Sequence, residues 1–205
     1  MIERAFFQRD PLTCAREMIG AELVWNECAG IIVETEAYFA IGDEACHTFA
    51  RPSARAFVEK HDAGAAYVYF NYGMYWLLNA LVKGGGEDGF VLIRAIEPTR
   101  GIEAMARRRF PKFPPESRTR KSTALCSGPG KLTIALGIDG HDHGRDLCGG
   151  NAVGFRAASA GTKVVEDVRI GISRAAHLPW RFLLHGSRFV SANAKARPPT
   201  RDGLA

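Results

Sequence analysis

The sequence predicts a mixed α/β (α+β) fold: a single domain with a curved antiparallel β-sheet of hairpins and surrounding helices. Three observations favour this class. Apolar runs are paired across short segments rich in turn residues, which is typical of β-hairpins. Strands and helices do not alternate regularly, as they would in a doubly wound parallel sheet. No internal repeat or flexible linker divides the 205 residues, so we expect residues 1–192 to form one domain.

The N-terminal half of the chain predicts one helix followed by two hairpins. Asp10 and Pro11 suit the N-cap and first position of a helix, which should end near Gly20. Residues 22–40 read as two strands, with the turn expected at residues 28–30. Residues 65–73 predict a further strand. Residues 74–98 predict a long hairpin, with the glycines at 84–86 and Gly89 in its loop.

The C-terminal half predicts two helices and two strands. A helix with a basic end is expected over residues 99–110, followed by a proline-rich basic loop at 111–130. Residues 131–138 predict the second helix, which residues 127–130 lead into. Strands are expected within 162–173 and 181–191. Residues 193–205 hold several prolines and few large apolar side chains, so we expect a disordered tail.

Composition narrows the class of protein without deciding its function. The chain is 46% hydrophobic and 24% charged, as in ordinary globular proteins, and no apolar run is long enough for a membrane helix. We expect a cytoplasmic protein, because the N-terminus lacks the long apolar stretch of a signal peptide. Its five cysteines include no CxxC pair and should be free thiols. The net charge of +5 suits a polyanionic partner. His141, His143 and Cys148 lack a second pair at zinc spacing, so no metal or other cofactor is expected.

Two carboxylates lie on one face of a predicted strand. In the segment VETEAY, alternation places Glu34, Glu36 and Tyr38 together, opposite Val33 and Thr35. A solvent-exposed strand face would explain this pattern. The alternative is a pocket in which a carboxylate orients and deprotonates water.

Aromatic residues are concentrated in YVYFNYGMYW, residues 67–76, which contains four of the five tyrosines. Aromatic core packing is the simpler interpretation. The choice of tyrosine over phenylalanine indicates that the hydroxyls matter, and Gly73 marks a bend that would turn Tyr72 outward. Tyrosines beside a carboxylate also suit a pocket in which a flat ligand such as a nucleobase stacks.

Several motifs occur in a fixed order: VETEAY, GDEACH, YVYFNYGMY, LIRAIEP, LCSGPGKL, and RIGIS followed by LPWRF. Together they closely resemble the alkyladenine (3-methyladenine) DNA glycosylase family in its compact bacterial form, from Leu12 to Ser191. The resemblance implies base-excision repair by a monomeric, nucleoid-associated enzyme that acts on double-stranded DNA containing damaged purines. Such an enzyme flips 3-methyladenine, 7-methylguanine, ethenoadenine or hypoxanthine out of the duplex and hydrolyses its N-glycosidic bond. No lysine lies in a motif that indicates lyase chemistry.

The resemblance also implies a role for each matching residue. Glu36 would activate the water, which Arg94 and the backbone carbonyl of Ile170 would help to hold. The base pocket would comprise Tyr38, Ala45, His47, Tyr69 and Asn79. Tyr72 would replace the flipped base in the duplex, with Met74 and Tyr75 against the minor groove. The possible phosphate contacts are Arg55, Arg107, Arg108, Arg109, Lys121, Ser127 and Lys131.

The chain departs from the family pattern near residues 53–56, where Arg55 aligns with the family's arginine and Ala56 replaces its asparagine. Asn71, next to Tyr72, replaces an aliphatic or small residue. Two other functions stay open at this point. A hydrolase of free nucleosides or nucleotides would need neither a wedge residue nor a basic surface. A non-catalytic lesion-binding protein would not need Glu36 and Arg94.

Overall fold

The computed structural model describes residues 1–114, 117, 119–159 and 161–192. For residues 119–121 it describes the backbone alone. The helices are α1 (Pro11–Glu17), α2 (His47–Ala50), α3 (Pro52–Lys60), α4 (Ile102–Arg109) and α6 (Pro129–Leu136), with the 3₁₀ helices η1 (Arg4–Phe7), η2 (Thr119–Ala124) and η3 (Gly140–Asp142). The strands are β1 (Glu22–Trp25), β2 (Cys28–Phe39), β3 (Ala66–Asn71), β4 (Tyr75–Val82), β5 (Gly89–Arg100), β6 (Val153–Arg156), β7 (Val164–Asp167) and β8 (Arg181–Leu184). The expected tail, residues 193–205, lies outside this range.

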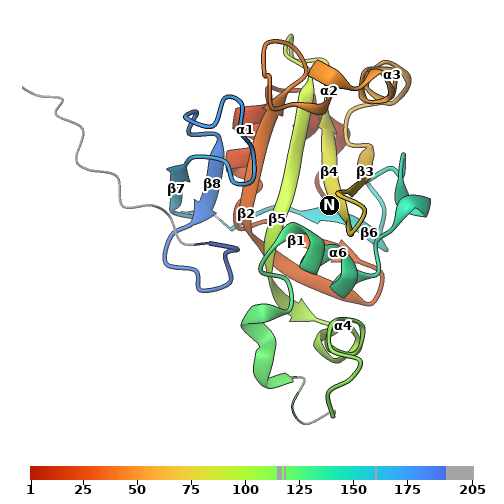
Figure 1. The fold of residues 1–205 in the computed structure, drawn as a ribbon, viewed down its shortest axis with the longest axis vertical. Helices are drawn as coiled ribbons and strands as arrows, with labels where there is room; N and C mark the ends of the chain where they lie inside the picture. The colour runs from red at the N-terminus through yellow and green to blue at the C-terminus, as the bar shows by residue number, and fades with distance from the viewer. Residues whose placement is uncertain (115–116, 118, 160, 193–205) are drawn as a thin grey trace, which may run out of the picture.

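The strands of the described chain form one antiparallel sheet in the order β3-β4-β5-β2-β1-β6, and β8 joins both β2 and β7. The long strands β2 and β5 run through its middle, and the sheet curls around them (Figure 1). Their pairing shifts register beside Glu34, and such bulges bend a strand and re-aim its side chains. The predicted α+β class with a curved antiparallel sheet is confirmed.

The main core lies where helices cover this sheet. Helix α1 packs against β2 and β5, and α6 packs against β4 and β5. Asp10 caps α1 as predicted, because its carboxylate accepts a hydrogen bond from the Thr13 N–H at 2.9 Å. A smaller cluster lies between α3 and the β3–β5 strands, around Phe57, Tyr67 and Phe90. Figure 1 places α2 and α3 at one end of the molecule and α4 at the other.

Several predicted boundaries were wrong. The first hairpin turns at Asn26, which has a φ of 53°, and residues 28–30 already belong to β2. The strand expected over 162–173 ends at Asp167, and the strand expected over 181–191 ends at Leu184. Strand β5 continues to Arg100, so α4 begins later than expected. Helices α2 and α3 and strand β6 were not predicted, and η2 lies in the predicted loop. All five cysteines lie within the described residues and are free thiols, as expected.

Truncating the buried side chain of Ile96 should destabilise the fold strongly. Ile96 is fully buried on β5 in the main core. Ile96→Ala should therefore lower the free energy of unfolding by about 2–5 kcal/mol, measured by urea denaturation. Ile41→Ala is the matched control, because Ile41 is 91% exposed and its loss should change stability by no more than about 0.5 kcal/mol. Equal losses in both variants would contradict this packing.

Candidate active site

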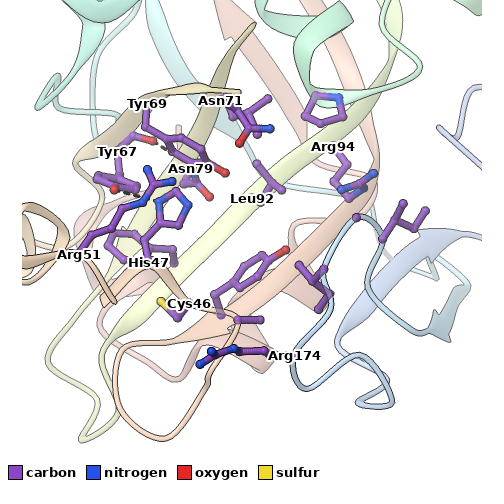
Figure 2. A pocket seen from close by; sticks show the side chains of 18 of the residues that line it. Cys46, His47, Arg51, Tyr67, Tyr69, Asn71, Asn79, Leu92, Arg94 and Arg174 are labelled. Atoms are coloured by element: carbon purple, nitrogen blue, oxygen red, sulfur yellow. Dashed lines mark hydrogen bonds between the residues drawn. The ribbon is translucent and has the colours of Figure 1, made fainter. Parts of the chain in front are cut away.

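A cavity of about 450 Å³ opens between β3–β5, the segment 44–51 and the loop 170–174. It brings together predicted pocket residues that are far apart in the sequence. The predicted site residues on its wall are Tyr38, Ala45, His47, Tyr69, Tyr72, Asn79, Arg94 and Ile170. Figure 2 shows Arg51, His47, Tyr67 and Tyr69 gathered on one side, with Arg94 across from them and Leu92 between. A volume of this size accommodates a small flat ligand.

The two strand carboxylates are buried beside this cavity. Glu34 and Glu36 have no exposed surface, so the interpretation of a solvent-exposed strand face is wrong. Arg94 on β5 lies between them, with Nε 2.8 Å from Glu34 and an Nη 3.1 Å from Glu36. Of these three side chains, Arg94 contributes to the cavity wall. Buried charges are stable only when they are paired and hydrogen-bonded, as these are.

Both oxygens of the Glu36 carboxylate accept hydrogen bonds. The Tyr38 hydroxyl donates to Oε2 at 2.7 Å, and the backbone N–H of Ile170 donates to Oε1 at 2.7 Å. Arg94 supplies the ionic contact to Oε2. Burial, together with the charge of Glu36, raises the pKa of Tyr38 well above its ordinary value, so this hydroxyl stays protonated and donates. Because Tyr38, Arg94 and Ile170 all line the cavity, the carboxylate lies one residue behind its surface.

A buried arginine holds the two loops that close this side of the cavity. Arg169 donates to both oxygens of Asp43, with the Nη2 contact at 2.9 Å, and to the Ala37 carbonyl at 3.0 Å. Its guanidinium also lies 4.6 Å from the ring centre of Tyr38 and 4.9 Å from that of Trp180. Asp43 in turn accepts from the Ala45 N–H. The ion pair therefore fixes the backbone at Ala45 and the ring of Tyr38.

The opposite side of the cavity is aromatic. The Tyr67 hydroxyl lies 3.1 Å from His47 Nδ1, and the Tyr69 ring packs against His47 with centroids 4.2 Å apart. Asn79 donates from its amide to the Tyr67 carbonyl at 3.0 Å, which fixes the orientation of this side chain. Burial, with a contribution from Arg51, lowers the pKa of His47 to about 4. Burial raises the pKa of Tyr67 to about 12, so at neutral pH His47 and Tyr67 are both uncharged.

The hairpin that joins β3 to β4 carries exposed apolar side chains at its tip. Tyr72 is 81% exposed and has a φ of 50°, which is unusual for a bulky residue. Met74 and Tyr75 follow it and are 62% and 44% exposed. The predicted bend at Gly73 therefore does turn Tyr72 outward. Phe70, also half-exposed, extends this apolar surface and was not predicted as part of it.

Comparison with known proteins decides the family. The model of the methylpurine-DNA glycosylase family matches residues 5–188. A protein of Rhizobium etli, named a candidate 3-methyladenine DNA glycosylase, is 45% identical over 92% of this chain and 87% of its own. A relative in Agrobacterium fabrum with the same name is 44% identical over 93% and 92%. The chain belongs to the methylpurine-DNA glycosylase family. It is thus a DNA glycosylase, and the predicted family is confirmed.

The cationic residues predicted to contact phosphates have different surroundings in this glycosylase. Arg55 donates to the carbonyl of Thr48 in α2 at 2.6 Å. Arg108 pairs with Glu27 and donates to the Ala135 carbonyl, and Arg109 donates to the Leu125 carbonyl. Arg107 and Lys131 are exposed, and Ser127 forms a β-bridge with Ala95. The side chain of Lys121 lies outside the described part of the chain.

Sequence reasoning missed four charged residues near the glycosylase cavity. Arg51, Glu44 and Arg174 line it, and Arg169 lies behind Tyr38. The Arg51 guanidinium lies 5.9 Å from the ring centre of Tyr69. Arg51 directly precedes α3, a helix that was not predicted because its sequence is largely polar. Arg174 lies in the loop after β7, next to residues that were expected to belong to that strand. Usable signals were the position of Glu44 inside the GDEACH motif and that of Arg169 at the start of the RIGIS motif.

Within the described residues, no group of three or more His, Cys, Asp or Glu side chains is placed to hold a metal ion. His143 instead lies 2.7 Å from the Val68 carbonyl, so it supports β3. The helices of the described chain include none that is long and apolar enough to cross a membrane.

The low pKa of His47 should make stability depend on pH. The folded pKa of about 4 lies below the ordinary value of about 6.5, so the unfolded chain binds more protons between these values. The free energy of unfolding should therefore fall as the pH drops from 6.5 to 4. His47→Gln should show a smaller fall, measured by urea denaturation at each pH. The difference between the two proteins at pH 8, where His47 is neutral in both states, gives the baseline. A fall of the same size in both would contradict the assignment.

Proposed function

We propose that this glycosylase flips an alkylated or deaminated purine out of double-stranded DNA and hydrolyses its N-glycosidic bond with a water activated by Glu36. One observation carries the proposal. The Glu36 carboxylate is buried and held by Tyr38, Arg94 and Ile170, directly behind a cavity of about 450 Å³. A fixed carboxylate beside an aromatic pocket suits general-base activation of a water that attacks the sugar carbon of a bound nucleotide.

In the proposed reaction, Glu36 accepts a proton from water as the water oxygen bonds to the sugar carbon. The bond from that carbon to the purine nitrogen breaks, and its electron pair leaves with the base. Arg94 and the carbonyl of Ile170 would hold the water, since both residues line the cavity, and the ion pair of Arg94 with Glu36 keeps the carboxylate oriented. An alkylated base carries a positive charge and leaves readily, whereas a neutral base such as hypoxanthine must be protonated.

The aromatic lining supports selection of damaged purines. Tyr38 and Tyr69 would stack on the two faces of the base, since both line the cavity. An aromatic face attracts a cationic alkylated base by about 0.5–2 kcal/mol. His47 is neutral at physiological pH and so does not repel such a base. Asn79, fixed by its bond to Tyr67, would crowd purines that bear a 2-amino group. The backbone at Ala45 would meet the base edge.

Base flipping is supported by the tip of the β3–β4 hairpin. Extruding a base costs a few kcal/mol, and an apolar wedge that fills the gap offsets part of this. Tyr72 is placed at the cavity wall and is exposed, as a wedge must be. Met74 and Tyr75 would pack nearby in the minor groove.

The DNA backbone would be contacted by cationic side chains, with residues 1–192 acting as one monomeric domain. Arg107 and Lys131 are exposed and so can reach phosphates. Arg55, Arg108 and Arg109 already contact backbone carbonyls in the protein. Lys121 and the backbone at Ser127 complete the proposed set. We expect no metal or other cofactor to take part.

An oligonucleotide substrate separates this proposal from the alternatives. A duplex with one ethenoadenine or one hypoxanthine, treated with alkali after incubation, should be cut at the lesion. A hydrolase of free nucleosides would leave this duplex intact and release base from the free nucleoside. A non-catalytic lesion-binding protein would slow the migration of the duplex in a native gel and release no base.

Replacing Glu36 by glutamine should abolish base release and spare lesion binding. Glutamine keeps the shape of the side chain but cannot accept the proton, so the single-turnover rate should fall by at least about 100-fold. Binding of an ethenoadenine duplex, measured by fluorescence anisotropy, should change little. A rate like that of the wild type would show that another group is the base.

Tyr72 and Tyr69 should respond differently to the structure of the DNA. Tyr72→Ala removes the wedge, so its rate defect should be large in paired DNA and small when the lesion lies in a bulge, where unstacking is partly done. Tyr69→Ala removes a stacking surface and should impair both substrates equally. Single-turnover rates on paired and bulged ethenoadenine test this. A Tyr72→Ala defect that is absent, or equal on both substrates, would reject the wedge role.

A further inference from the structure

Glu34 is a fully buried carboxylate that the proposed mechanism does not use. It lies two residues before Glu36 on β2. Within the described residues its oxygens accept from Arg94 Nε at 2.8 Å, Arg181 Nε at 2.9 Å, the Ser191 hydroxyl at 2.8 Å and the Ser191 N–H at 2.6 Å. Burial of an acid costs free energy, and burial next to a second acid costs more, so stability alone does not account for its presence.

Arg94 connects Glu34 to the proposed base. Its Nε contacts Glu34, one Nη contacts Glu36 at 3.1 Å, and the other Nη contacts the Ser191 hydroxyl at 3.3 Å. Every guanidinium nitrogen therefore has a partner, which fixes the rotation of the planar group. Glu34 and Ser191 supply two of these contacts and in turn bond to each other.

We propose that Glu34 is a positioning residue, which holds the Arg94 guanidinium and shares its charge so that Glu36 remains able to accept a proton. The inference rests on the proposed function, because it concerns the same base. When an arginine pairs with a single buried carboxylate, all of its stabilisation falls on that anion, and the carboxylate becomes a weaker base. A second carboxylate on the same guanidinium divides this stabilisation. Its own negative charge also opposes ionisation of its neighbour in a medium of low dielectric constant.

The charged groups around the two carboxylates come from several elements. Arg94 faces them from β5 and Arg181 from β8, while Tyr38 faces Glu36 from its own strand. Asp167 on β7 pairs with Arg181 at 3.1 Å, and the Arg169–Asp43 pair lies behind Tyr38. Neutralising Glu34 leaves Arg94 with Glu36 and Arg181 with Asp167. Each guanidinium then keeps a carboxylate, so Glu34→Gln should fold.

The test is the pH dependence of base release from a duplex with one ethenoadenine, in single turnover. For Glu34→Gln, the acidic limb of the rate profile should move to lower pH by about one unit, the size of shift that a neighbouring charge produces. The plateau rate should fall by up to about tenfold, because a base weakened by one unit loses at most that factor. Affinity for the lesion should stay within about twofold of the wild type, since Glu34 does not line the cavity.

Two control variants separate positioning from a merely structural role. Glu34→Asp keeps the charge, so the acidic limb of its rate profile should lie at the same pH as that of the wild type, even if the rate of base release is lower. Thr35→Val lies in the same strand and loses the buried hydrogen bond to the Ala15 carbonyl at 2.8 Å, with no change of charge near Arg94. It should lower stability and leave the limb in place. A stationary limb in Glu34→Gln, an equal shift in Thr35→Val, or failure of both Glu34 variants to fold would overturn the inference.

Failure of the proposed function and failure of the positioning role of Glu34 would give different rates of base release. If the wild type releases no base from any damaged duplex, the proposed function fails. If the wild type is active and Glu36→Gln is not, while Glu34→Gln has the pH profile of the wild type, only the positioning role of Glu34 fails.

Discussion

The buried contact between Arg94 and the two glutamates of β2 is the constraint on which the site depends. A carboxylate without partners would be unstable in the interior, so every oxygen of Glu34 and Glu36 needs donors. Those donors come from β5, from β8, from the loop after β7 and from Ser191 near the end of the described chain. The pairing of β8 with residues 34–36 of β2 brings Arg181 and the chain end within reach. The ion network thus explains why the C-terminal strands join the middle of the sheet.

The irregular register of β2 serves the same site. The pairing with β5 shifts on both sides of Glu34, and bulges of this kind are concentrated near active sites. On one face of this segment the two glutamates meet Arg94, and on the other Thr35 donates to the backbone of α1. One strand therefore connects the face that carries the two glutamates to the helix behind the sheet. The main core, and not a flexible loop, therefore fixes the position of Glu36.

The sequence predicted the parts of this molecule that depend on local periodicity. Apolar runs separated by turn residues predicted β2, β3, β4 and β5, and Asp10 with Pro11 predicted the start of α1. Helices α2 and α3 were missed because they are short and largely polar, so their apolar contacts through Phe57 appear only in the tertiary structure. The overlong strand at 162–173 has a physical reason as well. Ile170 and Ile172 are apolar yet line the cavity, and alternation cannot distinguish that environment from a strand. Partners such as Arg169 with Asp43 lie 126 positions apart and leave no local pattern.

The hairpin of β3 and β4 carries both the cavity tyrosine and the exposed tyrosine. Tyr69 lines the cavity from β3, and Tyr72 lies three residues farther on, in the turn that follows this strand. Tyr72 has a left-handed φ of 50°, a conformation that costs a bulky residue about 1–2 kcal/mol. Such strain persists where the surrounding structure enforces it and where function uses it. Here the paired strands enforce it, and the result is an aromatic ring held away from the core. Because the same short hairpin positions both tyrosines, the proposed function would set a flipped base and the side chain that replaces it at a fixed separation. On that proposal, the concentration of tyrosine in residues 67–76 has a geometric reason: one hairpin would supply both the stacking surface and the exposed ring.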